Sequence, residues 1–143
     1  MGLLSAIYGG ALTKAVNKGD VDEVASVLRN GSDPNEKQLG ISVLMNACNV
    51  GNISIVKLLL DKGAEVNSHD WDGMTPLMMA VAGRGHSDEK EKEDRCLEIV
   101  KVLLDAGVNA DYISWRRRTA LKEAEWAGHS RVVQLLREHG AKR

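Results

Sequence analysis

The sequence predicts an all-α solenoid of stacked helix-turn-helix units with protruding turn or hairpin loops. Four segments are versions of one unit: AVNKGDVDEVASVLRNGSDPN, ACNVGNISIVKLLLDKGAEVN, LEIVKVLLDAGVNAD and AGHSRVVQLLREHGAKR. Units that recur roughly every 33 residues are typical of solenoids, because one helix pair cannot bury its apolar face without a neighbour. A glycine closes every unit, at Gly31, Gly63, Gly107 and Gly140. Glycine just past a helix tolerates the left-handed conformation that ends it.

The first two units are in register with a spacing of 32 residues. Seven positions carry the same residue type in both units. They are Leu12 and Leu44, Ala15 and Ala47, Gly19 and Gly51, Val24 and Val56, Leu28 and Leu60, Gly31 and Gly63, and Asn35 and Asn67. Within the second unit, residues 43–49 and 53–60 are predicted to form the two helices, separated by Gly51 and ended by Gly63.

The third unit contains an insertion. Leu44 maps 33 residues on to Leu77, whereas Val56 maps 44 residues on to Val100. The extra residues therefore lie between the two helices of the third unit, at about 84–96. From the third unit to the fourth the spacings reverse, because Thr75 maps 44 residues on to Thr119 and Val100 maps 33 on to Val133.

These spacings predict a single domain over residues 1–143. We expect an N-terminal cap at about 1–10 and repeats at about 11–36, 37–69, 70–113 and 114–143. Residues 1–10 are apolar but lack the basic leader of a signal peptide, and Ala6 breaks the myristoylation pattern that Gly2 would begin. Leu3, Leu4 and Ile7 are expected to cover the exposed end of the first unit.

The stretch DWDGMTPLMMA resembles the opening of an ankyrin repeat, and LEIVKVLLDAGVNAD resembles its second half; the resemblance covers roughly residues 8–143. It implies a fold of stacked helix pairs that acts by binding other proteins. Its physical sense is clear at the start of a helix, where Thr75 can cap free amides and Pro76 fits the first turn.

The departures from the family pattern occur at two kinds of position. Met45, Met78 and Lys122 stand where the family usually has histidine. The fourth unit has Arg117 in place of the turn glycine and Ala120 in place of proline. Terminal units are commonly atypical, because one of their faces meets water.

The charge distribution limits the class of partner. The 143 residues carry a formal net charge of −1, which argues against a generally basic nucleic-acid-binding protein. Residues 114–143 hold eight Lys or Arg against three Glu, so the last unit is basic and the rest is acidic. With 43% hydrophobic residues and no Phe, the core is predicted to be aliphatic.

No pattern of catalytic, cofactor-binding or metal-ligating residues stands out. Cys48 and Cys96 have no metal-ligand spacing and are predicted to be buried free thiols, which favours a reducing cytoplasm. The four histidines share no close spacing with each other or with a cysteine. His129 stands where ankyrin units ordinarily have a structural histidine. No segment approaches the roughly 20 apolar residues of a membrane span.

The candidate partner-binding surface is the concave face, which in this family is lined by the turn tips and the first helix of each unit. Trp71 and Trp115 occupy the same tip position, 44 residues apart. Trp126 lies at the outward end of the first helix of the fourth unit. Trp and Arg are the commonest binding hot spots. The alternative is that Trp115 packs onto Trp71 and only stiffens the turns. The proposed surface comprises Gln38, Leu39, Ile41, Trp71, Asp72, Met74, Trp115, Arg116, Arg118 and Trp126.

The insertion is the second candidate surface. It can continue into one long helix, with Ser87 as its cap and an ion pair between Glu91 and Arg95. The apolar stripe of that helix would comprise Cys96, Ile99, Val100, Leu103 and Leu104. The same stretch could instead be a disordered loop. A solvated charged face is the plainer interpretation, and a docking element the alternative.

We therefore predict a non-catalytic protein-binding module, an adaptor or an inhibitor of its partner, without a cofactor and monomeric when unbound. The expected partner is a protein with an acidic and apolar patch rather than a membrane. Alternatives are a structural scaffold or a fragment of a longer repeat array, a nucleic-acid-binding protein that uses Arg116–Arg118, and an enzyme built on Cys96 and His86.

Overall fold

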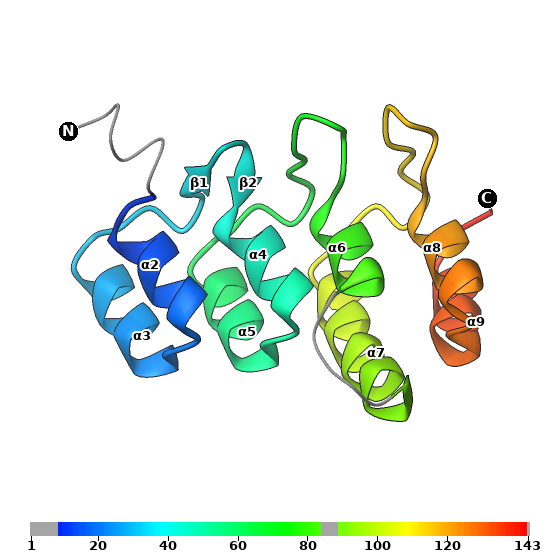
Figure 1. Cartoon of the computed structure of the whole chain (residues 1–143), viewed down its shortest axis with the longest axis horizontal. Coiled ribbons are helices and arrows are strands. Elements are labelled where there is room, and N and C mark those ends of the chain that lie inside the picture. Colours follow the sequence, from blue (N-terminus) through cyan, green and yellow to red (C-terminus); the bar gives the residue numbers. More distant parts are fainter. Residues whose placement is uncertain (1–8, 84–88, 143) are drawn as a thin grey trace.

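The computed structural model describes residues 9–83 and 89–142. Over these residues eight helices form four pairs in a single row (Figure 1), which confirms the all-α ankyrin-type solenoid. The pairs are α2 (Ala11–Lys18) with α3 (Val21–Arg29), α4 (Val43–Val50) with α5 (Ile53–Asp61), α6 (Pro76–Ala82) with α7 (Glu89–Asp105), and α8 (Ala120–Ala127) with α9 (Ser130–Glu138). The loops between successive pairs project from the same side of the row.

Hydroxyl side chains start the first helices of the last three units. The hydroxyl oxygens of Ser42, Thr75 and Thr119 each accept a hydrogen bond from the backbone N–H three residues ahead, at 3.1, 3.3 and 3.1 Å. Pro76 occupies the first turn of α6, so the expected role of the Thr-Pro pair is confirmed. Gly51 ends α4 at φ +85°, a left-handed conformation that favours glycine.

The loop of the second unit is a short hairpin. Strands β1 (Lys37–Gln38) and β2 (Ile41–Ser42) are antiparallel, with Lys37 opposite Ser42 and Gln38 opposite Ile41. Leu39 and Gly40 form the turn, with φ of +51° and +80°. Positive φ at both turn residues is the geometry that suits a two-residue hairpin. The corresponding tips of the third and fourth units are turns over 70–74 and 114–118.

The core is a continuous aliphatic stripe that runs through all four units. Leu12, Leu44, Leu77 and Leu121 occupy one register position in the first helices, and all four are buried. In the second helices, Ile55, Ile99 and Val132 share a position and are also buried. Glu23 stands at that position in the first unit, where it is partly exposed, and it binds Lys18 at 3.3 Å.

The opposite end of the row shows the matching change. Val16, Cys48 and Val81 share a buried position on the first helices, and Glu125 takes it in the fourth unit. Arg137 likewise replaces the leucine found in the second helices of the other units. The two charged residues form an ion pair at 2.7 Å. Both end faces of the row therefore carry charged side chains where internal units carry apolar ones.

The inserted segment lengthens α7, which runs over Glu89–Asp105. The prediction of one long helix is confirmed from Glu89 onward, whereas Ser87, His86 and the rest of 84–88 lie outside the described residues, as do Leu3, Leu4 and Ile7 of the expected cap. Of the predicted apolar stripe, Leu104 is partly exposed. The other four members, Cys96, Ile99, Val100 and Leu103, are buried.

The added turns of α7 pack against both neighbouring units. The backbone N–H of Arg131, in the first turn of α9, donates to Glu93 at 2.9 Å, and its guanidinium donates to Asp94 at 2.5 Å. On the other side Arg95 lies over Gly51, where a Cβ atom would come within 2.8 Å of Cδ of Arg95. The added turns thus connect the second and fourth units rather than standing free in solvent.

Candidate functional site: the concave face

Two hollows lie between the turn tips and the first helices. The first is lined by Thr13, Asn17, Gln38, Leu39, Ile41, Ser42, Val43 and Asn46. The second, of about 400 Å³, is lined by Ile41, Met45, Asn46, Asn49, Met74, Met79, Ala82 and Arg118. Because both are lined by Ile41 and Asn46, the two hollows adjoin, and together they extend from the first unit to the tip of the fourth; we call the pair the depression.

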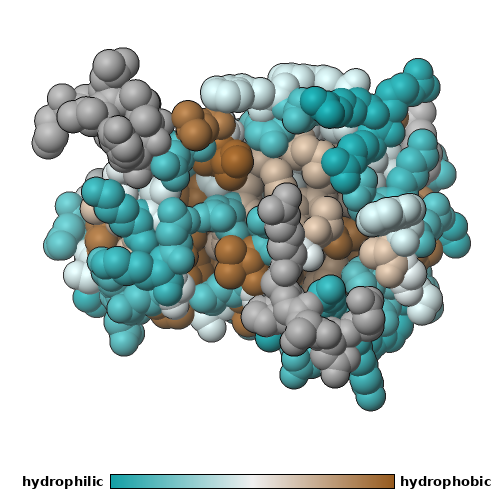
Figure 2. All heavy atoms as spheres, viewed as in Figure 1, coloured by the Kyte–Doolittle hydropathy of each residue, from teal (hydrophilic) through white to brown (hydrophobic). Residues whose placement is uncertain are grey.

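Apolar surface gathers on this face. Figure 2 shows brown and tan side chains in the middle of the face, below the projecting loops, with teal on both sides. Leu39 and Ile41 of the hairpin, two residues of the predicted surface, are exposed. Trp126 is 90% exposed on α8. Exposed apolar side chains beside a hollow are a common mark of a binding surface.

Each of the two tip tryptophans packs against the glycine of the preceding tip. A Cβ atom at Gly40 would lie 2.8 Å from Nε1 of Trp71, and one at Gly73 would lie 3.3 Å from Cγ of Trp115. Both side chains nevertheless remain largely exposed, at 71% and 63%. One side of each indole therefore stiffens the loops while most of its surface remains available to a partner.

The structure does not favour the alternative in which Trp115 packs onto Trp71. Among the described residues, the ring that Trp115 contacts is His69, edge-on, with centroids 5.4 Å apart. Tyr112 stacks on the same imidazole at 6.4 Å. The backbone N–H of Trp115 also donates to the carbonyl of Asp72 at 3.3 Å, which joins the third tip to the fourth.

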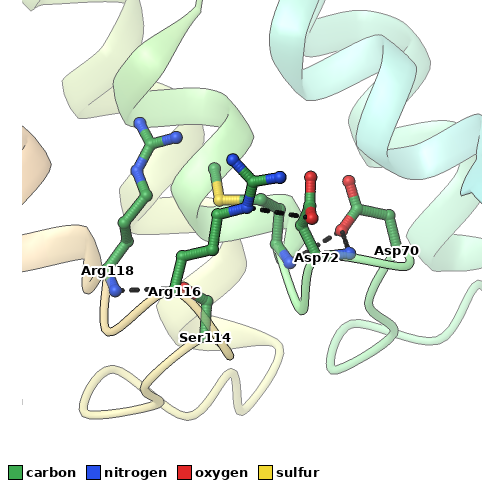
Figure 3. A network of polar contacts seen from close by, with 6 residues as sticks. Asp70, Asp72, Ser114, Arg116 and Arg118 are labelled. Atoms are coloured by element: carbon green, nitrogen blue, oxygen red, sulfur yellow. Dashed lines mark hydrogen bonds and ion pairs between the residues drawn. The ribbon is translucent and has the colours of Figure 1, made fainter.

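Two of the three arginines of the fourth tip form ion pairs within the chain, and Figure 3 shows the pair of Arg116 with Asp72. Nε of Arg116 donates to Oδ1 of Asp72 at 3.1 Å, in an ion pair between two exposed side chains. Nε of Arg118 donates to Glu123 at 2.5 Å, and this hydrogen bond raises the pKa of Arg118. The tip therefore does not present three free arginines, which argues against a nucleic-acid site there.

Two polar residues that sequence reasoning missed shape the tips. Oδ1 of Asp70 accepts hydrogen bonds from the backbone N–H groups of Asp72 and Met74, both at 2.9 Å. Oγ of Ser114 accepts one from the N–H of Arg118 at 3.0 Å. The signal was present in the sequence, because Asp70 and Ser114 occupy the same register position, 44 residues apart.

One predicted surface residue is placed differently. Met74 is buried, with 8% of its surface exposed, and lines the second hollow instead of projecting from the tip. The hydrogen bond from its N–H to Asp70 holds the backbone so that Trp71 and Asp72 form the exposed part of the turn. Gln38 is half-buried and lines the first hollow.

The first helices contribute asparagines that sequence reasoning also missed. Nδ2 of Asn46 donates to Oδ1 of Asn17, which connects the first two units across the depression. Asn17 and Asn49 share a register position with Ala82 and Trp126. Extending the register from Trp126 to the other units would have identified this row.

The two cysteines are buried and free. Burial raises the pKa of both thiols, that of Cys96 to about 12, so they are protonated and weakly nucleophilic at neutral pH. This argues against the enzyme alternative built on Cys96. Within the described part of the chain, no three His, Cys, Asp or Glu side chains could hold a metal ion, and no helix could cross a membrane.

Comparison with known sequences gives two family matches. The model described as "Ankyrin repeats (3 copies)" matches residues 12–88. The model described as "Ankyrin repeat" matches residues 72–114. Together they cover residues 12–114, which hold the first three units, whereas the helices of the fourth unit lie beyond the matched residues.

Several curated proteins are similar to this chain. It is 34% identical over 129 residues to the ankyrin repeat, SAM and basic leucine zipper domain-containing protein 1 of Dasypus novemcinctus, covering 90% of this chain and 26% of that protein. It is 45% identical over 102 residues to the ankyrin repeat and KH domain-containing protein mask of Drosophila melanogaster, covering 70% of this chain and 2% of that protein. The 2-5A-dependent ribonuclease of Mus musculus matches over 72 residues at 42% identity, and the match covers 49% of this chain and 10% of that protein. The chain spans about a quarter of the length of the first such relatives.

Proposed function

Since the chain belongs to the ankyrin-repeat family, whose repeats generally mediate protein–protein interaction, we propose that it is a non-catalytic module that holds a partner protein on its concave face. The observation that carries this proposal is the pair of tip tryptophans, 71% and 63% exposed on adjacent loops, together with the two adjoining hollows between the tips and the first helices. Tryptophans in such positions bury a large area on binding at a small cost in side-chain entropy.

The charges at the basic end of this face favour an acidic partner. The fourth tip carries three arginines, and the two carboxylates bound to them, Asp72 and Glu123, leave one positive charge in excess. Exposed Lys122 on α8 adds a second. Exposed ion pairs contribute little to stability, so a partner carboxylate can compete for Arg116 at small cost. The partner patch is therefore proposed to be both acidic and apolar.

The role proposed for the module is that of an adaptor or an inhibitor, monomeric until it meets its partner. Two free, buried thiols are suited to the reducing cytoplasm, which is the proposed location. In this proposal the module has no cofactor and no catalytic residue.

The test is affinity capture from the lysate of the source cell with the native chain and with the Trp71→Ala, Trp115→Ala double variant. We expect the native chain alone to retain a partner, because the variant loses two large contact areas. Both side chains are mostly exposed, so the melting temperature should fall by no more than about 5 °C. Mass spectrometry identifies the retained proteins, and calorimetry checks the fold.

A matched control is the Glu98→Ala, Lys101→Ala double variant, which changes two exposed residues on α7. It should retain the partner as the native chain does. Equal retention by the tryptophan variant would move the binding surface away from the tips. A large fall in its melting temperature would make the tryptophans structural.

A further inference from the structure

The second hollow of the concave face has the chemistry of a specific subsite. We call it the methionine pocket: Met45, Met74 and Met79 line it with Ile41 and Ala82, while Asn46, Asn49 and Arg118 add polar groups. We propose that this pocket takes an aromatic side chain of the partner and that Arg118 binds a carboxylate beside that ring. This inference rests on the proposed function. The partner segment is then a peptide in which an acidic residue neighbours an aromatic one.

The walls of the pocket suit an aromatic ring. Three thioether side chains meet there from α4, α6 and the third tip. Methionine is unbranched and polarisable, so it adapts to the shape of a guest and makes favourable sulfur–aromatic contacts. Met45 is fully buried, Met74 is nearly so, and Met79 is partly exposed. The volume of about 400 Å³ lies within the usual range of ligand pockets, about 300–1,000 Å³.

The rim of the pocket provides the positive charge. Arg118 lines the pocket, and its bond to Glu123 uses only the Nε–H of a guanidinium that has five N–H donors. Figure 3 shows this guanidinium apart from the ion pair of Arg116 with Asp72. With the excess positive charge of the fourth tip, Arg118 can bind a second carboxylate, and this charge complementarity selects an acidic neighbour for the ring.

The amides on the floor of the depression suit an extended segment. Asn46 lines both hollows, and Asn49, about one helical turn further along α4, lines the methionine pocket. An amide side chain both donates and accepts hydrogen bonds, as a peptide backbone does. A segment that crosses them would place its ring in the pocket and its following residues toward the fourth tip.

The test is a titration of the whole chain, labelled with ¹³C at the methionine methyl groups, with the peptide acetyl-Gly-Phe-Asp-Gly-amide. We expect the methyl signals of Met74 and Met79 to shift with increasing peptide, because the ring current of the guest acts on them. Two comparison peptides replace Phe by Leu or Asp by Asn. Each should bind roughly two- to tenfold more weakly, as the loss of one such contact implies.

Two conservative variants test the assigned residues. Met79→Leu keeps the volume but removes a sulfur, and should reduce the preference for Phe over Leu. Arg118→Gln should abolish the preference for Asp over Asn. Lys57→Gln, which removes one positive charge from an exposed position on α5 that lines neither hollow, should leave that preference intact.

Three outcomes would overturn the proposal. The first is that the methyl signals do not move at peptide concentrations up to about 5 mM. The second is equal binding of the Phe and Leu peptides. The third is a shift of the methyl signals with protein concentration in the absence of peptide, which would assign the pocket to a second copy of the chain. Loss of the lysate partner in the tryptophan variant together with unmoved methyl signals would leave the proposed function standing and reject the aromatic guest. Moving methyl signals with unchanged lysate capture would support the pocket and reject the tryptophan anchors.

Discussion

Cys48 shows at the scale of a single residue how the register controls chemistry. It occupies the buried position that holds Val16 and Val81 in neighbouring units, so the thiol is surrounded as a valine would be. Burial raises its pKa, and the nearby Cys96 raises it further. The position needs a small apolar side chain, and the sulfur has no partner that requires it in the fold.

This burial gives a pH dependence with a definite sign. In the unfolded chain a thiol ionises near pH 8.5, whereas in the folded chain both thiols keep their protons to higher pH. Above about pH 8.5 the unfolded state therefore loses protons that the folded state retains. The free energy of unfolding should fall as pH rises, by about 1.4 kcal/mol per pH unit for each thiol. Urea denaturation between about pH 8 and 10 measures this slope.

Cys48→Val is the variant that isolates the cause, since the neighbouring units already carry valine at this position. It should leave the stability at pH 7 within about 1 kcal/mol of the native value and halve the alkaline slope. An unchanged slope in Cys48→Val would show that other groups cause the alkaline loss.

At the scale of one element, the lengthened helix α7 is held at both sides. Glu93 and Asp94 bind Arg131 of the fourth unit, and Arg95 covers Gly51 of the second. Because short helical segments are only marginally stable in water without tertiary packing, these contacts help to hold the added turns in place. The charged face is therefore partly engaged within the chain, and the surface it leaves for docking is smaller than the sequence suggested.

We expect the Glu93→Gln, Asp94→Asn double variant to loosen the first turns of α7. Hydrogen exchange measured by mass spectrometry should show faster exchange over 90–95 and unchanged exchange in α4. High salt should have the same effect on the native chain, because these ion pairs are exposed enough to be screened. Glu98→Gln on the same helix is the matched control. Equal exchange in all three proteins would mean that apolar packing alone orders these turns.

At the scale of the whole molecule, the two end faces distinguish a free module from a self-associating scaffold. Glu23 and the pair of Glu125 with Arg137 stand where internal units place apolar residues. Stacking another unit on the last face would bury this ion pair, and removing two charges from water costs more than a surface pair returns. The charged faces therefore favour the proposed monomer.

Restoring the internal pattern should reverse this behaviour. In the Glu125→Val, Arg137→Leu double variant the last face becomes apolar, and we expect the sedimentation coefficient to rise with protein concentration while that of the native chain stays constant. Glu125→Gln with Arg137→Gln, which removes the charges and keeps the face polar, should remain monomeric. A native chain that already associates would support the scaffold alternative instead.

The register of the sequence predicted the helix pairs, the insertion and the exposed tip tryptophans, because each follows from spacing and local chemistry. It could not predict that Arg116 binds Asp72 or that Met74 turns inward. Those outcomes depend on how adjacent loops lie against each other in space, and the insertion separates their residues by 44 positions. The boundaries of the single domain and the identity of the binding residues stay predictions.

The bridging position of α7 also affects how the stack comes apart. In a linear array, cooperativity depends on the coupling between adjacent units. The added turns strengthen the coupling of the third unit to the second and the fourth. Among the described residues, no added helical turns join the first unit to the second, and the bonds between these two units include those of Asn46 to Asn17 and of Glu65 to Asn35. Under mild denaturant the chain should therefore lose its first unit early, while the other three, which carry both tryptophans and the methionine pocket, melt together as one cooperative block.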